Sequence, residues 1–149
     1  MSKSDTWESD LLKLVFNNTT ASKIGDITGL VGSTAVGSLY VSLHTSDPGE
    51  TGSQNTNETS YTNYQRVAVA RTVGNWTISG NSPTQVANAA TITFAQCGAS
   101  GATLTHMGVG TDSSGAGKLL YSGQLTSPLS VSNNITPMFT AGQLIITED

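Results

Sequence analysis

The chain has 149 residues and a mass of 15.4 kDa, which is the size of one domain. Only 11% of the residues are charged, and the net charge of −4 would repel phosphate, so the composition excludes electrostatic binding of nucleic acid. A membrane-spanning helix needs a run of about 18 apolar residues, and no apolar run in this sequence is that long. Thr, Ser and Asn together account for 51 residues, and with the recurring Val they predict an all-β fold.

A short helix is predicted at the N-terminus, from residue 5 to about residue 17. Asp5 is the expected N-cap, and Glu8 three residues later completes a capping-box pattern. The Asn17-Asn18 pair is a suitable C-terminal stop, because asparagine tolerates the left-handed backbone that often ends a helix.

This helix carries an apolar stripe at helical spacing, formed by Trp7, Leu11, Leu14 and Val15. Leu12 and Phe16 widen the stripe. A helix of this length is not stable alone in water, so its apolar stripe must dock on another surface. That surface is either the chain's own β domain or a neighbouring subunit, and the four stripe residues are the candidate partner-binding residues.

The chain is predicted to have two parts. Residues 19–38 hold four glycines and many small residues, which indicates a loosely structured arm after the helix. We therefore divide the chain into an N-terminal helix and arm, residues 1–38, and a β-sandwich domain, residues 39–149.

Period-two patterns and regular turn signals predict seven to nine short strands after residue 38. This number of short strands favours a β-sandwich or a jelly roll. Turn signals lie at Asp47–Glu50 and Asp112–Gly115, and residues 50–63 form a polar loop. The expected strands cover residues 39–44, 65–73, 76–79, 89–95, 103–109, 118–125, 129–131, 139 and 144–147.

The residues that could carry catalysis do not form a recognisable set. His44 and His106 are the candidate general bases near neutral pH, but both lie inside predicted strands and no Gly-x-Ser-x-Gly turn is present. Asp112 is the only acidic residue from 72 to 147, so a glycosidase carboxylate pair is missing there. The single cysteine, Cys97, provides neither a disulfide nor a zinc ligand set. We expect no enzymatic activity and no cofactor.

A metal site is not expected either. Three acidic residues could approach a calcium ion, but their spacing does not match a twelve-residue calcium loop; they are Asp47, Glu50 and Glu58.

The C-terminal half is unusually poor in charge. Residues 72–147 contain only two charged side chains, Asp112 and Lys118. A free monomer normally keeps more surface charge for solubility, whereas small hydroxyl and amide side chains suit contacts between subunits. This composition predicts a homo-oligomer, with a trimer favoured.

Five sequence blocks carry a resemblance to a known family. They are LYVSLHTSDPGETG at 39–52, YQRVAV at 64–69, NAATITF at 88–94, THMGV at 105–109 and LLYSGQL at 119–125. Their order and spacing resemble a family of small virion proteins of tailed bacteriophages, whose members are often labelled tail fibre proteins. The resemblance implies short β-sandwich modules behind an N-terminal helix, and it extends from Asp5 to Thr147.

The resemblance implies a structural protein of the phage virion that is made in the bacterial cytoplasm. The length fits a capsid decoration, or cement, protein that bridges major capsid protein subunits, and this function is favoured with the major capsid protein as partner. A tail fibre or another tail-associated adhesion protein is the alternative. For a fibre, Tyr61 and Tyr64 are the only pair of aromatic residues in a predicted loop. Neither function requires nucleic acid or a membrane.

Overall fold

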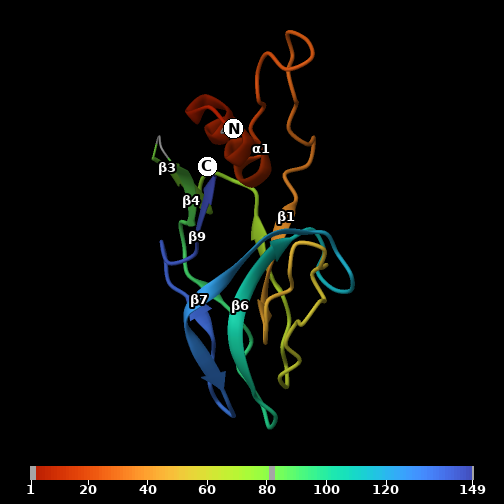
Figure 1. The fold of residues 1–149 in the computed structure, drawn as a ribbon, viewed down its shortest axis with the longest axis vertical. Coiled ribbons are helices and arrows are strands. Elements are labelled where there is room, and N and C mark those ends of the chain that lie inside the picture. Colours follow the sequence, from red (N-terminus) through yellow and green to blue (C-terminus); the bar gives the residue numbers. More distant parts are fainter. Residues whose placement is uncertain (1–2, 81–82, 149) are drawn as a thin grey trace. The chain divides into compact units, whose positions relative to one another are not determined.

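The computed structural model describes residues 3–80 and 83–148, which form one helix and nine strands in three antiparallel sheets (Figure 1). The chain divides into two compact units, and each unit is assembled from separate segments. Unit 1 comprises residues 1–38, 70–91 and 139–149, and unit 2 comprises residues 39–69 and 92–138. The segment 1–38 therefore belongs to a unit that also contains later residues, and the division at residue 38 into two domains stays a prediction.

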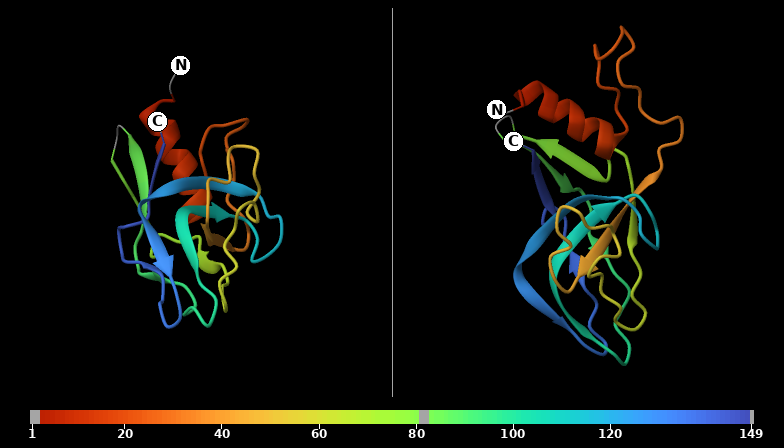
Figure 2. Two further views of the ribbon diagram at one scale, coloured as in Figure 1. Left: turned by 60° about the horizontal axis from the view of Figure 1, so that its bottom comes forward. Right: turned by 45° about the vertical axis from the view of Figure 1, so that its right-hand side comes forward.

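Unit 1 packs the helix against a three-stranded sheet. Helix α1 (Asp5–Asn17) contacts β3 (Trp76–Ser79) and β4 (Thr84–Asn88), and β4 pairs in turn with β9 (Ile145–Glu148). The right-hand view of Figure 2 shows α1 lying across these strands. The shared core includes Leu12, Phe16, Trp76, Val86 and Ile146, all of them buried.

The helix covers the predicted residues, but its first turn is capped differently. Ser4, not Asp5, is the N-cap, and its hydroxyl accepts a hydrogen bond from the backbone N–H of Trp7 at 3.4 Å. Glu8 does not close a capping box, because its carboxylate is buried and accepts from the backbone N–H of Thr84 at 3.4 Å. Asn18 ends the helix with a left-handed φ of 54°, as predicted.

Unit 2 is built on a four-stranded sheet with the order β2-β1-β6-β7. Its strands are β1 (Ser38–His44), β2 (Val67–Ala70), β6 (Ala102–Gly110) and β7 (Leu119–Val131). A two-stranded sheet joins β5 (Ile92–Thr93) to β8 (Met138–Phe139). The centre of the larger sheet is the antiparallel β1–β6 pair, in which Val41 lies opposite Val109 and His44 opposite His106.

The prediction of a mostly β chain with an N-terminal helix is confirmed, whereas the finer prediction of a sandwich or jelly roll stays a prediction. Two strand predictions were wrong. β4 was missed, because two of its three buried residues are the polar Thr84 and Asn88. The segments 118–125 and 129–131 form one strand, because β7 is an edge strand that tolerates Pro128 and a register shift beside it.

Candidate functional site

The predicted partner-binding stripe lies beside the buried face of α1, not on it. Trp7, Leu11, Leu14 and Val15 are all half-buried. The fully covered positions are Glu8, Leu12 and Phe16, which follow one another at intervals of four residues and face the sheet of unit 1. The ring of Phe16 packs edge-on against Trp76, with the ring centroids 4.9 Å apart. The helix thus docks within its own unit and leaves part of every stripe residue exposed.

Arg71 holds the C-terminal end of this helix. Its guanidinium donates from Nε to the carbonyl of Val15 and from Nη2 to the carbonyl of Leu14, both at 2.6 Å. A helix end leaves its last carbonyls without helical partners and carries partial negative charge, so a cation there is stabilising. Nη1 also donates to the hydroxyl of Ser33 at 3.2 Å, which ties the following arm to the same side chain.

The arm is more ordered than its glycine content predicted. Asn18 accepts from the backbone N–H of Ser33 at 2.6 Å and donates to its carbonyl at 2.8 Å. Ala21 and Leu30 exchange two backbone hydrogen bonds, at 3.0 and 2.8 Å. Gly29 is required in this closed loop, because it has a φ of +73° and a Cβ there would meet the Ala21 carbonyl.

The arm also exposes large apolar side chains. Ile27 is 95% exposed and Val31 is 67% exposed. Because the loop is fixed to the helix end, these two side chains and the half-buried stripe residues belong to the same unit. These six apolar residues of unit 1, all exposed or partly exposed, are here together called the attachment surface.

In unit 2, Ser42 and His44 form a buried hydrogen-bonded pair. The Ser42 hydroxyl lies 2.8 Å from Nε2 of His44, and Nδ1 of His44 lies 2.9 Å from the Thr56 carbonyl. This is the spacing of a nucleophile and a base, but both residues are 0% exposed, so no substrate can reach the hydroxyl. Their role is to fasten the polar loop to β1.

The burial of His44 predicts a pH dependence of stability. Burial lowers the pKa of His44 below its ordinary value of 6.5, the backbone contact with Thr56 opposing it in part. The unfolded chain therefore binds a proton that the folded chain does not bind as the pH falls below about 6.5. As the pH is lowered through this range, we expect the free energy of unfolding to fall. The total fall is about 1.4 kcal/mol for each unit between the pKa of His44 in the unfolded chain and its pKa in the folded chain.

Urea unfolding at pH values from 7.5 to 5 measures this effect. The free energy of unfolding should depend less steeply on pH in His44→Gln than in the wild-type chain. His106→Gln is the matched control, because it removes the imidazole directly opposite on β6. A slope that persists in His44→Gln would contradict the assignment.

A second buried polar group joins the loop to the β6–β7 turn. The Arg66 guanidinium forms a two-point ion pair with Glu58, with Nε–Oε1 and Nη2–Oε2 distances of 2.7 Å. It also donates to the carbonyls of Asp112 at 2.8 Å and Gly115 at 2.7 Å. The Arg66 side chain is only 2% exposed and that of Glu58 14%. No pattern in the sequence predicts this pair, because the two residues lie eight positions apart and no periodicity relates them.

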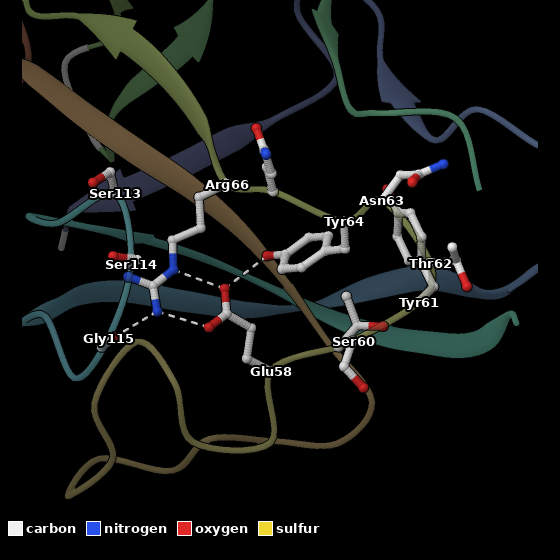
Figure 3. A pocket seen from close by; sticks show the side chains of 12 residues that line it. Glu58, Ser60, Tyr61, Thr62, Asn63, Tyr64, Arg66, Ser113, Ser114 and Gly115 are labelled. Carbon is white, nitrogen blue, oxygen red and sulfur yellow. Dashed lines mark hydrogen bonds and ion pairs between the residues drawn. The ribbon is translucent and has the colours of Figure 1, made fainter. Parts of the chain in front are cut away.

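This ion pair lies in a pocket of about 460 Å³, shown in Figure 3. The view places Arg66, Glu58 and Tyr64 between the turn at Ser113–Gly115 and the segment at residues 60–63. Most other lining residues are small and uncharged, and they include Ser60, Thr62, Asn63, Gln65, Ser113 and Ser114.

The two loop tyrosines belong to the wall of this pocket and are not exposed tips. Tyr61 is 3% exposed and donates to the Ala95 carbonyl at 2.9 Å. Tyr64 donates to Oε1 of Glu58 at 2.8 Å and accepts from the backbone N–H of Leu43 at 3.0 Å. Burial raises the pKa of Tyr61 to about 12, and it also raises the pKa of Tyr64. The rings lie 5.2 Å apart, edge to face.

The three acidic residues considered for calcium do not converge. Asp47 and Glu50 line a separate pocket of about 360 Å³ beside His106, whereas Glu58 pairs with Arg66. Across residues 3–80 and 83–148, no group of three or more His, Cys, Asp or Glu side chains is placed to hold a metal ion. Nor does the same part of the chain contain a helix with the length and hydropathy to cross a membrane.

Sequence comparison decides the family. The model of a family described as Podophage GP4 fiber I protein gp80 matches residues 2–147. The chain belongs to this family. No curated protein matches the chain significantly.

Membership of the gp80 family makes the chain a phage fibre protein, a structural component of the virion and not an enzyme. The family resemblance stated from the five sequence blocks is thereby confirmed. The match supports the tail-fibre alternative better than the favoured prediction of a capsid decoration protein.

Proposed function

We propose that this gp80-family protein is a structural subunit of a podophage tail fibre, and that its attachment surface binds a neighbouring virion protein. The observation that carries the first part is the family match over nearly the whole chain. The second part is supported by helix α1, which keeps Trp7, Leu11, Leu14 and Val15 partly exposed although its adjacent face is anchored on the sheet of unit 1. In this proposal residues 1–38 are the attachment element.

The partner in this proposal is another fibre chain or another tail protein. An interface to the major capsid protein, as in a decoration protein, is the competing function. We further propose that the fibre subunit is a homo-oligomer, with a trimer favoured. Only two charged side chains lie between residues 72 and 147, so copies of the chain would repel one another little through this region. This low charge supports self-association.

Deletion of residues 2–38 is a poor test of attachment, because it removes Leu12 and Phe16 from the core of unit 1. The variant Trp7→Ala instead truncates a half-buried stripe residue. Truncating a tryptophan at an interface costs about 2 kcal/mol or more, so we expect roughly thirtyfold weaker attachment. Co-production with the wild-type chain, followed by mass spectrometry of purified virions, measures the ratio of the two chains.

The matched control is Ile145→Ala, which truncates a 54% exposed apolar residue on β9 of the same unit. It should enter virions at the ratio in which it is produced. The same virions give the copy number, which we expect to match tail proteins and to lie far below that of the major capsid protein. A copy number near that of the major capsid protein would contradict the fibre assignment. Self-association would be contradicted if chemical cross-linking gave only monomers and no cross-linked oligomers.

A further inference from the structure

We infer that copies of this chain join head to tail: the arm loop of one copy, residues 21–30, places Ile27 in an apolar pocket on unit 1 of the next copy. The inference rests on the self-association proposed above and names the two surfaces that form it. Three observations carry it. The loop presents an exposed apolar side chain on a braced backbone, the same unit has an open apolar pocket, and the two surfaces are opposite in charge.

The arm loop presents Ile27 to solvent on a fixed backbone. Ile27 is 95% exposed, and Figure 1 shows the arm projecting past helix α1. The base of the loop is closed by the two backbone hydrogen bonds between Ala21 and Leu30. Near its tip, the Asp26 carboxylate accepts from the backbone N–H of Thr28 at 2.7 Å. A tip braced in this way loses little conformational entropy on binding, and a nearly bare isoleucine gains much from burial.

An open pocket of about 470 Å³ lies on unit 1, between the C-terminal end of α1 and the strand β3. Three apolar residues line it: Val73, Trp76 and Ile78. Trp76 is buried, whereas Val73 is 72% exposed and Ile78 is half-buried, so the pocket leaves apolar surface in water. The loop of the same chain does not fill it, because Ile27 is almost wholly exposed.

The loop and the pocket carry opposite charges. Lys13 on α1 is the charged residue among the described residues that line the pocket, and it forms no ion pair within residues 3–80 and 83–148. Asp26 directly precedes Ile27. Hydrogen bonds from the hydroxyl and the backbone of Thr28 lower the pKa of the Asp26 carboxyl, so this group is ionised at neutral pH. Seating Ile27 in the pocket of the next copy brings the Asp26 carboxylate toward the ammonium group of Lys13.

The loop and the pocket are different surfaces of one unit, so every copy offers both. A contact between two different surfaces is heterologous, and heterologous contacts either close into rings or continue as filaments. A closed ring of three copies gives each chain two such contacts and covers every Ile27, in agreement with the trimer proposed above. The competing arrangement is a two-fold dimer in which the Ile27 side chains of two copies meet each other.

Disulfide cross-linking of the full chain tests the arrangement. Ile27→Cys and Val73→Cys are combined in one chain, which is oxidised mildly and separated on a gel without reductant. We expect covalent dimers and trimers, because each disulfide joins position 27 of one copy to position 73 of the next. Cys97 is 2% exposed and should stay reduced. The matched control combines Ile27→Cys with Ile145→Cys, an exposed apolar position of the same unit outside the pocket, and should give monomers.

Three results of this experiment would overturn the inference. Covalent dimers of the variant that carries Ile27→Cys alone would show the two-fold arrangement. A disulfide between positions 27 and 73 of a single chain would show that the loop fills its own pocket. Cross-linked oligomers of the Ile145→Cys control in equal amount would show collision between copies and no specific contact.

Sedimentation of the uncross-linked chain measures the strength of the contact. Ile27→Ser should weaken self-association by about tenfold to a hundredfold, the effect of removing one large apolar side chain from a buried position. The free energy of unfolding should stay unchanged, because Ile27 is exposed in the separate chain. Ile145→Ser is the matched control and should self-associate like the wild-type chain.

The charge pair is tested by a double-mutant cycle. Asp26→Asn keeps the side-chain oxygen that accepts from Thr28 and removes the charge, and Lys13→Met removes the opposite charge. Each single variant should weaken self-association about twofold to fivefold, and the double variant should be no weaker than either one. Fully additive effects would overturn the pairing of Asp26 with Lys13 across the contact.

The outcomes separate this inference from the proposed function. Wild-type oligomers that persist in Ile27→Ser would overturn the head-to-tail contact alone and leave self-association standing. A wild-type chain that stays monomeric at all concentrations would overturn both. Attachment to a neighbouring virion protein is tested independently by the incorporation of Trp7→Ala.

Discussion

Arg66→Met is expected to lower the free energy of unfolding of unit 2 by about 3–5 kcal/mol, the usual cost of breaking a buried ion pair from one side. The side chain is 2% exposed, so the substitution leaves the Glu58 carboxylate, itself 14% exposed, without its cation. The carbonyls of Asp112 and Gly115 lose their donor in the same step. The polar loop and the β6–β7 turn would therefore lose all the contacts that Arg66 makes between them.

Urea unfolding followed by tyrosine near-ultraviolet circular dichroism measures this loss, because all four tyrosines lie in unit 2 and both tryptophans lie in unit 1. Lys118→Met is the control, since it removes a positive charge from an exposed position just past the same turn. A loss below about 1 kcal/mol for Arg66→Met would mean that the pair behaves as a surface salt bridge.

Phe16→Ala should destabilise unit 1 by about 3–5 kcal/mol, the cost of truncating a fully buried aromatic residue. The side chain is 0% exposed and packs against Trp76, so tryptophan fluorescence should shift toward the red as that indole meets water. Leu14→Ala on the half-buried stripe is the matched comparison and should cost about 1 kcal/mol, in proportion to its smaller buried area.

These two variants distinguish two roles of helix α1, which are docking within unit 1 and contact with a neighbouring protein. If Phe16→Ala and Leu14→Ala had equal effects on stability, the helix would not be docked by the face at Glu8, Leu12 and Phe16. If Leu14→Ala alone reduced incorporation into virions while unit 1 stayed folded, the stripe would be a contact with a neighbour.

The sequence patterns predicted those parts of the fold in which side-chain periodicity and burial coincide. Helix α1 was placed at its observed bounds, and β1, β3 and β6 were placed within one residue of theirs. β4 was not predicted, because Asn88 occupies a core position. Its side-chain amide donates to the carbonyls of Ala90 and Thr140 and accepts from the backbone N–H of Leu144. A buried residue with a complete set of hydrogen bonds is indistinguishable from a loop asparagine in one sequence.

The candidate sites were less predictable, because they depend on contacts between distant parts of the chain. Arg71 lies more than fifty residues from the helix end that it caps, and Arg66 lies nearly as far from the turn that it holds. The apolar stripe was recognised from its spacing, but the spacing could not show that Leu12 and Phe16, rather than Trp7 and Leu11, face the sheet.

The interleaving of the two units has a consequence for the order of folding during synthesis. Unit 1 takes its edge strand β9 from the last residues of the chain, where Ile146 pairs with Val86 and Glu148 forms an ion pair with Lys3. Residue 138 is the last residue of unit 2, so unit 2 can fold before β9 is in place. Helix α1 precedes β9 in the chain by more than 120 residues, so the sheet on which the helix packs is complete only after β9 has been made. A chain that lacked β9 would leave an open strand edge on β4.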